Sequence, residues 1–215
     1  PPSEMLPPHL PLFPLPTVVL FPGVFLPLHI FEPRYRQMVV KALEGDRIIG
    51  MTLLRPGHEE HYEDRPPVYA VGCAGLITHV ERQQDGRFNL ILRGLSKFRI
   101  QEEEPPTDGV LYRVAHVTPL QEDVPEGDRP QLQDARRRLE TVLAPSLESE
   151  AGSRLPRDMS DDDLVNALSQ YLDLEPVEKQ ALLEQDGVLS RCRTLLELIE
   201  MKVLMQRRPD GGRLH

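Results

Sequence analysis

Proline constrains the start of this chain more than any other residue type. The 215 residues include 22 prolines, about twice the usual share, and ten of them lie within residues 1–33. Each proline removes a backbone donor and breaks a helix, so this segment predicts strands that are short, interrupted or at a sheet edge. We predict these strands at 10–13, 18–21 and 24–30, with a turn at Pro22-Gly23.

A helix is predicted directly after this segment. Pro33 suits the first helical position, where its missing N–H costs nothing. Apolar residues then recur at helical spacing, namely Tyr35, Met38, Val39, Ala42 and Leu43. Gly45 is predicted to end the helix in a left-handed conformation.

From Arg47 to Pro119 the apolar pattern has a period of two, which is typical of strands. We predict strands at 48–54, 71–83, 87–101 and 112–117, with a polar loop at 55–67. Asp85-Gly86 predicts a hairpin between the two long strands, and Gly94 predicts a bulge or bend. Several antiparallel strands with one early helix indicate a small, partly closed barrel.

Beyond Pro119 the pattern is helical. We predict a first helix capped by Asp128, followed by a loop at 144–157. A second helix is predicted to begin with a capping box at Ser160. A short helix opened by Pro176 and a last helix from Val188 to about Arg207 follow. Four helices with short connections indicate a bundle. The predicted fold class is therefore α+β, with an antiparallel pseudo-β-barrel at 1–119, a four-helix bundle at 120–208 and a flexible tail at 209–215.

Composition and charge exclude several classes of protein. No apolar run approaches the ~18 residues of a membrane-spanning helix, and the proline-broken first apolar stretch does not fit a signal peptide. The net charge of −9 disfavours broad nucleic-acid binding. The hairpin nevertheless carries five basic residues that keep a local RNA-binding patch open as an alternative, namely Arg82, Arg87, Arg93, Lys97 and Arg99. Cys73 and Cys192 are interpreted as buried thiols of a protein in a reducing cytoplasm.

No arrangement of reactive residues predicts catalysis. The chain has no P-loop and no Gly-x-Ser-x-Gly elbow. Ser96 and Lys97 are neighbours on a strand, so they point to opposite faces and are expected at the surface rather than in a dyad. The run His58-Glu59-Glu60-His61 lies in a polar loop without the helical spacing of a metal motif. We therefore expect no enzymatic activity, no cofactor and no metal site.

Several segments resemble the N-terminal domain of Lon proteases of the bacterial type. They are LPLFPL (10–15), VLFPG (19–23), LPLHIFEPRY (26–35), VGCAGLI (71–77), LRGLSKFRI (92–100) and EKQALLE (178–184), and the match extends over roughly 10–207 in the family's order. The resemblance implies a PUA-like pseudo-barrel followed by a helical bundle, recognition of damaged or unfolded polypeptides, and self-association. The ATPase and Ser–Lys peptidase modules of the full protease do not occur in this sequence, so we expect either a stand-alone member or a piece of a longer protein.

The leading functional hypothesis is a non-catalytic module that binds unfolded or hydrophobic polypeptide segments, in cytoplasmic protein quality control. We expect contacts from five residues of the proline-rich segment and the helix start, namely Phe21, Phe25, His29, Phe31 and Tyr35. Although a single phenylalanine there is more often a core residue, aromatic side chains on a stiffened backbone suit an apolar partner, and an extended peptide can add to a proline-broken strand edge.

Two alternatives remain at this point. The first is an RNA-binding PUA-like module. The second is a self-assembly or regulatory protein, because the last helix carries four apolar residues outside its main stripe, namely Leu198, Met201, Leu204 and Met205. The expected partners are therefore unfolded polypeptides, a protease or chaperone, and a second copy of the chain, with nucleic acid disfavoured and no membrane.

Overall fold

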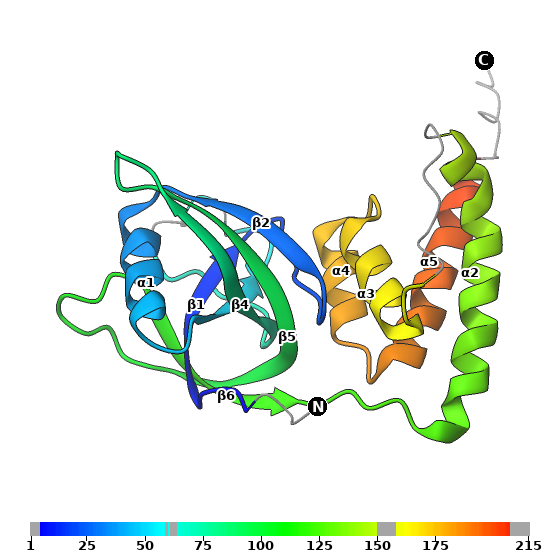
Figure 1. Cartoon of the computed structure of the whole chain (residues 1–215), viewed down its shortest axis with the longest axis horizontal. Helices are drawn as coiled ribbons and strands as arrows, with labels where there is room; N and C mark the ends of the chain where they lie inside the picture. The colour runs from blue at the N-terminus through cyan, green and yellow to red at the C-terminus, as the bar shows by residue number, and fades with distance from the viewer. Residues whose placement is uncertain (1–4, 59, 61–63, 150–157, 207–215) are drawn as a thin grey trace, which may run out of the picture. The chain divides into compact units, whose positions relative to one another are not determined.

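The structure is a computed structural model that describes residues 5–58, 60, 64–149 and 158–206 (Figure 1). Within these residues the chain forms a six-stranded sheet and five α-helices, so the predicted α+β class is confirmed. The chain divides into two compact units. The first holds residues 1–122 and 166–184, and the second holds 123–165 and 185–215.

The sheet belongs to the first unit. Its strands are β1 (His9–Leu15), β2 (Phe25–Ile30), β3 (Ile48–Leu53), β4 (Val71–Arg82), β5 (Phe88–Glu103) and β6 (Arg113–Leu120). The order is β2-β5-β4-β3-β1-β6, and β6 also pairs with the second half of β5. The pairings therefore run in a ring from β5 through β4, β3, β1 and β6 back to β5, while β2 pairs with β5 outside this ring.

One strand pair differs from the predicted antiparallel set. β1 and β3 are parallel, with Leu12 opposite Gly50 and Leu15 opposite Leu53. Parallel neighbours need a long crossover connection, and here β2 and α1 (Pro33–Glu44) provide it. The apolar face inside the ring is built around Phe98, which is fully buried with Leu10, Leu12 and Ala74.

The proline-rich segment forms two strands rather than three. Residues 18–21, which were predicted as a strand, have no regular secondary structure. Leu20 and Phe21 are nevertheless fully buried, and the Phe21 N–H donates to Oε1 of Gln170 at 2.9 Å instead of to a strand. Burial in a turn and burial in a strand give the same apolar pattern, so the sequence did not distinguish them.

Helix α1 begins at Pro33 as predicted, but its end differs. Gly45 has a φ of −119°, so the predicted left-handed glycine is wrong. Arg47 instead adopts the left-handed conformation, with a φ of 62°, and its N–H donates to the Ala42 carbonyl at 2.9 Å. The side chain of Arg47 also donates from Nε to the Ile77 carbonyl at 3.3 Å, which stabilises this turn against β4.

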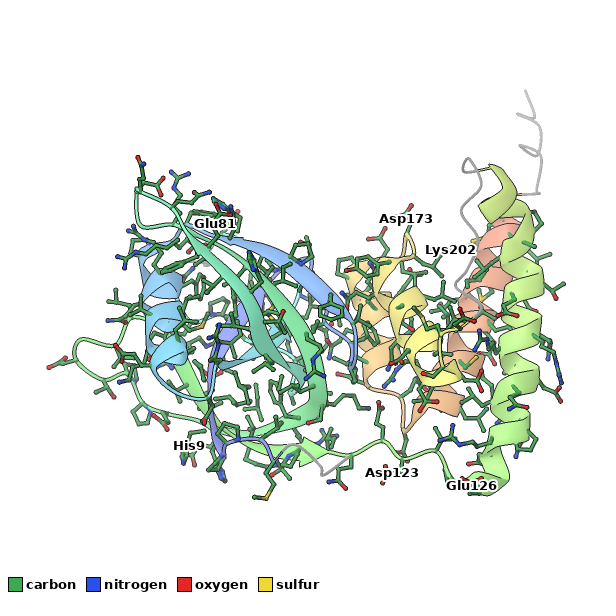
Figure 2. All side chains as sticks on the ribbon, in the orientation of Figure 1. His9, Glu81, Asp123, Glu126, Asp173 and Lys202 are labelled. Carbon is green, nitrogen blue, oxygen red and sulfur yellow. The ribbon has the colours of Figure 1, made fainter. Side chains whose placement is uncertain are left out.

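The hairpin between β4 and β5 is confirmed. Gly86 has the positive φ that the turn requires, 84°, and the Gln83 N–H donates to the Arg87 carbonyl at 2.8 Å. Glu81 lies near the tip of this hairpin (Figure 2).

The second unit contains α2 (Arg129–Ser149), the start of α3 (Asp161–Tyr171) and α5 (Val188–Gln206). Helix α2 packs against α5. The predicted loop at 144–157 is wrong for its first six residues, because α2 continues through Pro145 to Ser149; residues 150–157 lie outside the described part. A proline inside a helix removes one hydrogen bond without always ending the helix.

Capping starts the two remaining helices. At α3 the Asp163 N–H donates to Oγ of Ser160 at 3.2 Å, as predicted. Helix α4 (Pro176–Leu183) belongs to the first unit and begins with a capping box. The Glu175 side chain accepts a hydrogen bond from the Glu178 N–H, and the Glu178 side chain accepts one from the Glu175 N–H. In the described part of the chain, no helix has the length and apolar content needed to cross a membrane. The predicted tail at 209–215 lies outside the described residues.

Candidate functional site

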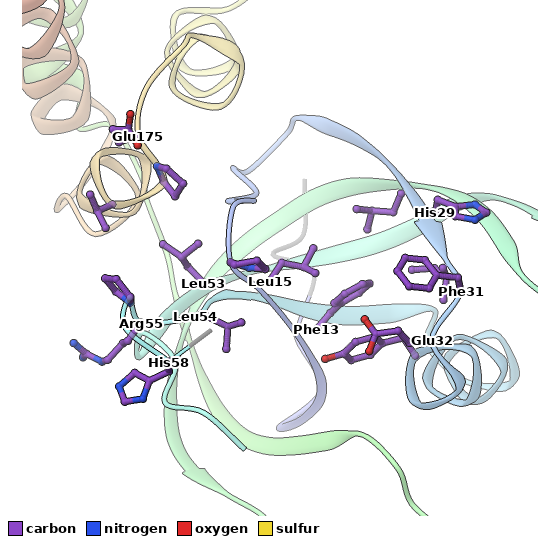
Figure 3. Close-up of a pocket in the computed structure, with 17 residues that line it drawn as sticks. Phe13, Leu15, His29, Phe31, Glu32, Leu53, Leu54, Arg55, His58 and Glu175 are labelled. Atoms are coloured by element: carbon purple, nitrogen blue, oxygen red, sulfur yellow. The ribbon is translucent and has the colours of Figure 1, made fainter. Parts of the chain in front are cut away.

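A pocket of about 580 Å³ opens in the first unit, between β1, β2, β3, the loop after β3 and the start of α4 (Figure 3). Its apolar lining includes Phe13, Leu15, Leu28, Ile30, Leu53 and Leu54. Pro176 and Val177 of α4 and Pro56 of the loop add further apolar surface. This volume is within the usual range for ligand sites, which are mostly apolar with a few polar groups.

Two stacked aromatic rings form one wall of the pocket. The rings of Phe13 on β1 and Tyr35 on α1 lie parallel within 18°, with centroids 4.4 Å apart. The Arg34 guanidinium lies 4.8 Å from the centre of the Tyr35 ring. Phe13 and Tyr35 are both buried, so packing fixes their positions before any partner binds.

Strand β2 and the residue after it form another wall. Along β2 the exposed residues Phe25, Pro27 and His29 alternate with less exposed ones. His29 donates from Nδ1 to Oδ1 of Asn89, its cross-strand neighbour, at 2.7 Å. Phe31 is 56% exposed although it lines the pocket, and its ring stacks on that of His29 with centroids 6.0 Å apart. An exposed phenylalanine at the rim of an apolar pocket is a typical anchor for a partner.

The polar rim carries both signs of charge. Glu32 and Glu175 contribute carboxylates, and Arg55 and His58 lie on the opposite part of the rim from His29 and Phe31 (Figure 3). Glu32 is held by Arg34, with Oε2 and Nη2 2.9 Å apart. A rim with both charges does not select a partner by the sign of its charge, so apolar contact is the property that this site offers.

The structure gathers three of the five predicted contact residues at the pocket, namely His29, Phe31 and Tyr35. Phe25 is 52% exposed but does not line the pocket. Phe21 is fully buried, so it is a core residue and its predicted role as a surface contact is wrong. Its ring has no access to a partner while the unit is folded.

The sequence did not identify the apolar residues that complete the pocket. Phe13, Leu53 and Leu54 fall within predicted strands, Leu15 lies just outside the predicted strand at 10–13, and Val177 falls within a predicted short helix, but none of them is among the predicted contact residues. These residues come from three segments far apart in the chain. Periodicity shows that a residue is buried but not which distant segment it contacts.

The predicted basic patch on the hairpin loses one member. Lys97 was expected at the surface, but its side chain is only 5% exposed. Its Nζ lies 2.6 Å from Oε1 of Glu122 and donates to the Leu183 carbonyl at 2.9 Å. Lys97 is therefore an internal ion-pair residue that an RNA phosphate does not reach.

The run at 58–61 is only partly described, because Glu59 and His61 lie outside the described residues. Where the chain is described, no three or more histidine, cysteine, aspartate or glutamate side chains are arranged to hold a metal ion.

A mixed sheet with an apolar pocket is an arrangement typical of binding modules. The sequence profile of the ATP-dependent protease La (LON) substrate-binding domain matches residues 9–201. The chain therefore belongs to the Lon substrate-binding domain family.

Full-length relatives are similar to the chain over almost all its residues. The Lon protease of Cytophaga hutchinsonii is 27% identical over 208 residues, which are 94% of this chain and 25% of that protein. The Lon protease of Flavobacterium johnsoniae is 27% identical over 210 residues, again 94% of this chain and 25% of that protein. The chain thus spans about a quarter of the length of these relatives.

Two solved structures share the fold. The Lon N-terminal domain protein from Xanthomonas campestris has a TM-score of 0.59 at 24% identity, covering 94% of this chain and 99% of that chain. The N-terminal domain of Mycobacterium avium complex Lon protease has a TM-score of 0.65 at 20% identity, covering 89% of this chain and 98% of that chain.

Proposed function

We propose that this chain binds exposed hydrophobic segments of unfolded polypeptides through the pocket beside β2. The observation that carries the proposal is a preformed apolar pocket of about 580 Å³ with an exposed phenylalanine, Phe31, at its rim. The match to a substrate-binding domain family supports a polypeptide as the partner.

The physical basis is the free energy of burying apolar side chains. Moving one Leu or Phe side chain from water into such a pocket contributes about 1.5–3 kcal/mol. A folded protein keeps most of these side chains in its core, whereas an unfolded one presents them, so the pocket distinguishes the two without reading a sequence. The mixed charges of the rim, Glu32 and Glu175 with Arg55, fit the same broad selectivity.

The wider role follows from the relatives. We propose that the chain works with a protease in quality control of cytoplasmic proteins, because its relatives are Lon proteases. The ring of strand pairings supports a PUA-like pseudo-barrel within 1–119. The four-helix bundle at 120–208 stays a prediction.

Crosslinking to a permanently unfolded protein, reduced and carboxymethylated α-lactalbumin, tests the proposal. Phe31→Asp places a charge at the rim and is expected to lower the affinity at least tenfold, about 1.4 kcal/mol. Phe25→Asp is the matched control, because Phe25 is equally exposed on the same segment but does not line the pocket. It is expected to change the affinity less than twofold.

Both variants replace half-exposed side chains, so both are expected to fold, which circular dichroism checks. If the two well-folded variants crosslink as strongly as the wild type, the pocket is not the binding site. If both lose binding equally, the contact surface extends along the whole of β2.

A further inference from the structure

Strand β2 has one edge without a strand partner in the described part of the chain. It pairs with β5 only, from Phe25 opposite Arg93 to Ile30 opposite Phe88. Among the described residues the other five strands close into a ring, so β2 is the strand that ends the sheet. A strand edge presents backbone donors and acceptors at a fixed spacing, which another extended chain can pair with.

The hydrogen bonds at the start of β2 determine which residues present these groups. The Gly94 N–H donates to the Val24 carbonyl at 2.8 Å. In an antiparallel pair such bonded positions alternate, so Leu26, Leu28 and Ile30 bond to β5. The main-chain groups of Phe25, Pro27 and His29 therefore point to the open edge.

At its Phe25 end, this edge of β2 is already occupied by hydrogen bonds from side chains. The Phe25 carbonyl accepts a hydrogen bond from Nε2 of Gln170 at 3.1 Å and another from the Tyr171 hydroxyl. Pro27 has no N–H and offers only its carbonyl. The open part therefore consists of the Pro27 carbonyl and both main-chain groups of His29.

This short open edge lies at the pocket. Leu28, His29 and Ile30 all line the pocket, as does Phe31 directly after them. A backbone that pairs with His29 lies about 4.8 Å from β2. Residues opposite each other in a sheet share a face, so partner residues opposite Leu28 and Ile30 direct their side chains to the pocket face, towards Phe13.

We propose that an extended apolar polypeptide segment adds to β2 as an antiparallel strand at His29, with every second side chain entering the pocket. This inference rests on the proposed function and specifies how the same site holds its substrate. The chemistry of the partner follows from the two features that meet here. Only a polypeptide backbone supplies donors and acceptors that match the Pro27 and His29 groups, and only apolar side chains suit the lining beside them.

The test uses the wild-type chain and a fluorescein-labelled peptide, Lys-Thr-Leu-Thr-Phe-Thr-Leu-Thr-Lys. With Leu and Phe facing the pocket, the threonine N–H groups face β2 and the Leu and Phe N–H groups face away. One methylated peptide carries N-methyl groups on the two threonines that flank Phe, and the matched control carries them on Phe and one Leu. The threonine-methylated peptide is expected to bind at least tenfold more weakly by fluorescence anisotropy, and the control within threefold of the parent.

Amide hydrogen exchange measured by NMR gives a second readout. Binding of the parent peptide is expected to slow exchange of the His29 amide at least tenfold and to leave the Ile30 amide, already bonded to β5, unchanged. If the control peptide loses affinity instead of the threonine-methylated one, strand addition holds but the strand is parallel.

Other outcomes overturn the inference. If all three peptides bind equally and His29 exchange does not change, the peptide docks by side chains alone; strand addition then fails while the proposed function stands. If the His29 amide is protected without peptide and the chain sediments as a dimer, a second copy covers the edge. If the parent peptide does not bind and crosslinking of Phe31→Asp matches the wild type, the proposed function fails as well.

Discussion

Lys97 is a charged residue whose side chain is buried in the first unit. Its side chain is 5% exposed, and that of Glu122, its partner at 2.6 Å, is 9% exposed. The Leu183 carbonyl accepts a second hydrogen bond from Nζ, which helps to offset the loss of water around the ammonium group. The pair stabilises the fold only while both partners are present, because removing one leaves a buried charge.

Lys97→Met is therefore expected to lower the free energy of unfolding by about 3–5 kcal/mol, because Glu122 keeps its charge without this partner. Urea unfolding followed by circular dichroism measures the change. Lys41→Met is the matched control, because Lys41 and Glu44 form an exposed pair worth less than about 1 kcal/mol.

A double variant, Lys97→Met with Glu122→Leu, is expected to recover most of the loss, because it removes both charges. An equal effect of Lys97→Met and Lys41→Met would show that the buried pair contributes no more than a surface pair.

At the scale of elements, Gly94 allows the proline-rich turn to lie against β5. A Cβ on Gly94 would lie 2.0 Å from the Phe21 carbonyl oxygen, closer than any real contact. The Gly23 N–H donates to the Gly94 carbonyl at 2.9 Å, which holds the turn at this distance. The bulge predicted at Gly94 is confirmed as a register shift, because Gly75 pairs with Gly94 and Cys73 pairs with Lys97. The close approach of the turn was not visible in the sequence.

Gly94→Ala is expected to destabilise the chain by about 3 kcal/mol, because backbone and not a flexible side chain must move. Thermal unfolding followed by circular dichroism measures the change. Gly127→Ala is the control, because no atom lies within 4 Å of its added Cβ and its φ is not positive. The prediction fails if the two alanine variants unfold at the same temperature.

On the scale of the whole molecule, each compact unit contains one buried cysteine. Cys73 lies on β4 in the first unit and Cys192 on α5 in the second, and both thiols are free. Burial, with a smaller contribution from the nearby Asp161 carboxylate, raises the pKa of the Cys192 thiol to about 11. At pH 8 only roughly one Cys192 thiol in a thousand is then a reactive thiolate.

Native protein at pH 8 is therefore expected to resist modification by iodoacetamide at both cysteines. With increasing urea, Cys192 is expected to react at a lower concentration than Cys73, because the second unit is smaller and a smaller unit buries less of its surface. Mass spectrometry of the labelled peptides identifies which thiol has reacted. Simultaneous labelling of both cysteines at every urea concentration would show that the two units unfold as one.

The raised pKa also gives a pH dependence with a definite sign. The folded state holds the Cys192 proton more tightly than the unfolded state does. The stability from this thiol is thus complete below about pH 9 and is lost as the pH rises towards 11.

The sequence alone determined the features that arise within a few residues of one another. Pro33 starts α1 because its ring restricts φ to a helical value. Gly86 forms the hairpin turn because it adopts a positive φ, and Ser160 caps α3 with its side chain. Each of these effects acts within a few residues. Alternation along 71–101 likewise predicted β4 and β5, since one covered face is enough to produce it. The six segments given in the sequence analysis were also sufficient to predict the family to which the chain belongs.

The tertiary structure alone decided which apolar residues meet and which remain exposed. Phe21 is buried and Phe31 lies at the rim of a pocket, although both stand in similar proline-rich surroundings. Lys97 is buried against Glu122 and Leu183, which both lie far from it in the chain, so its own surroundings in the sequence do not predict this burial. The open edge of β2 exists because the other strands close a ring without it. Contacts between segments far apart in the chain determine which side chains are buried, which strands pair and where the pocket lies. Such contacts leave no pattern in the neighbouring sequence from which they could be predicted.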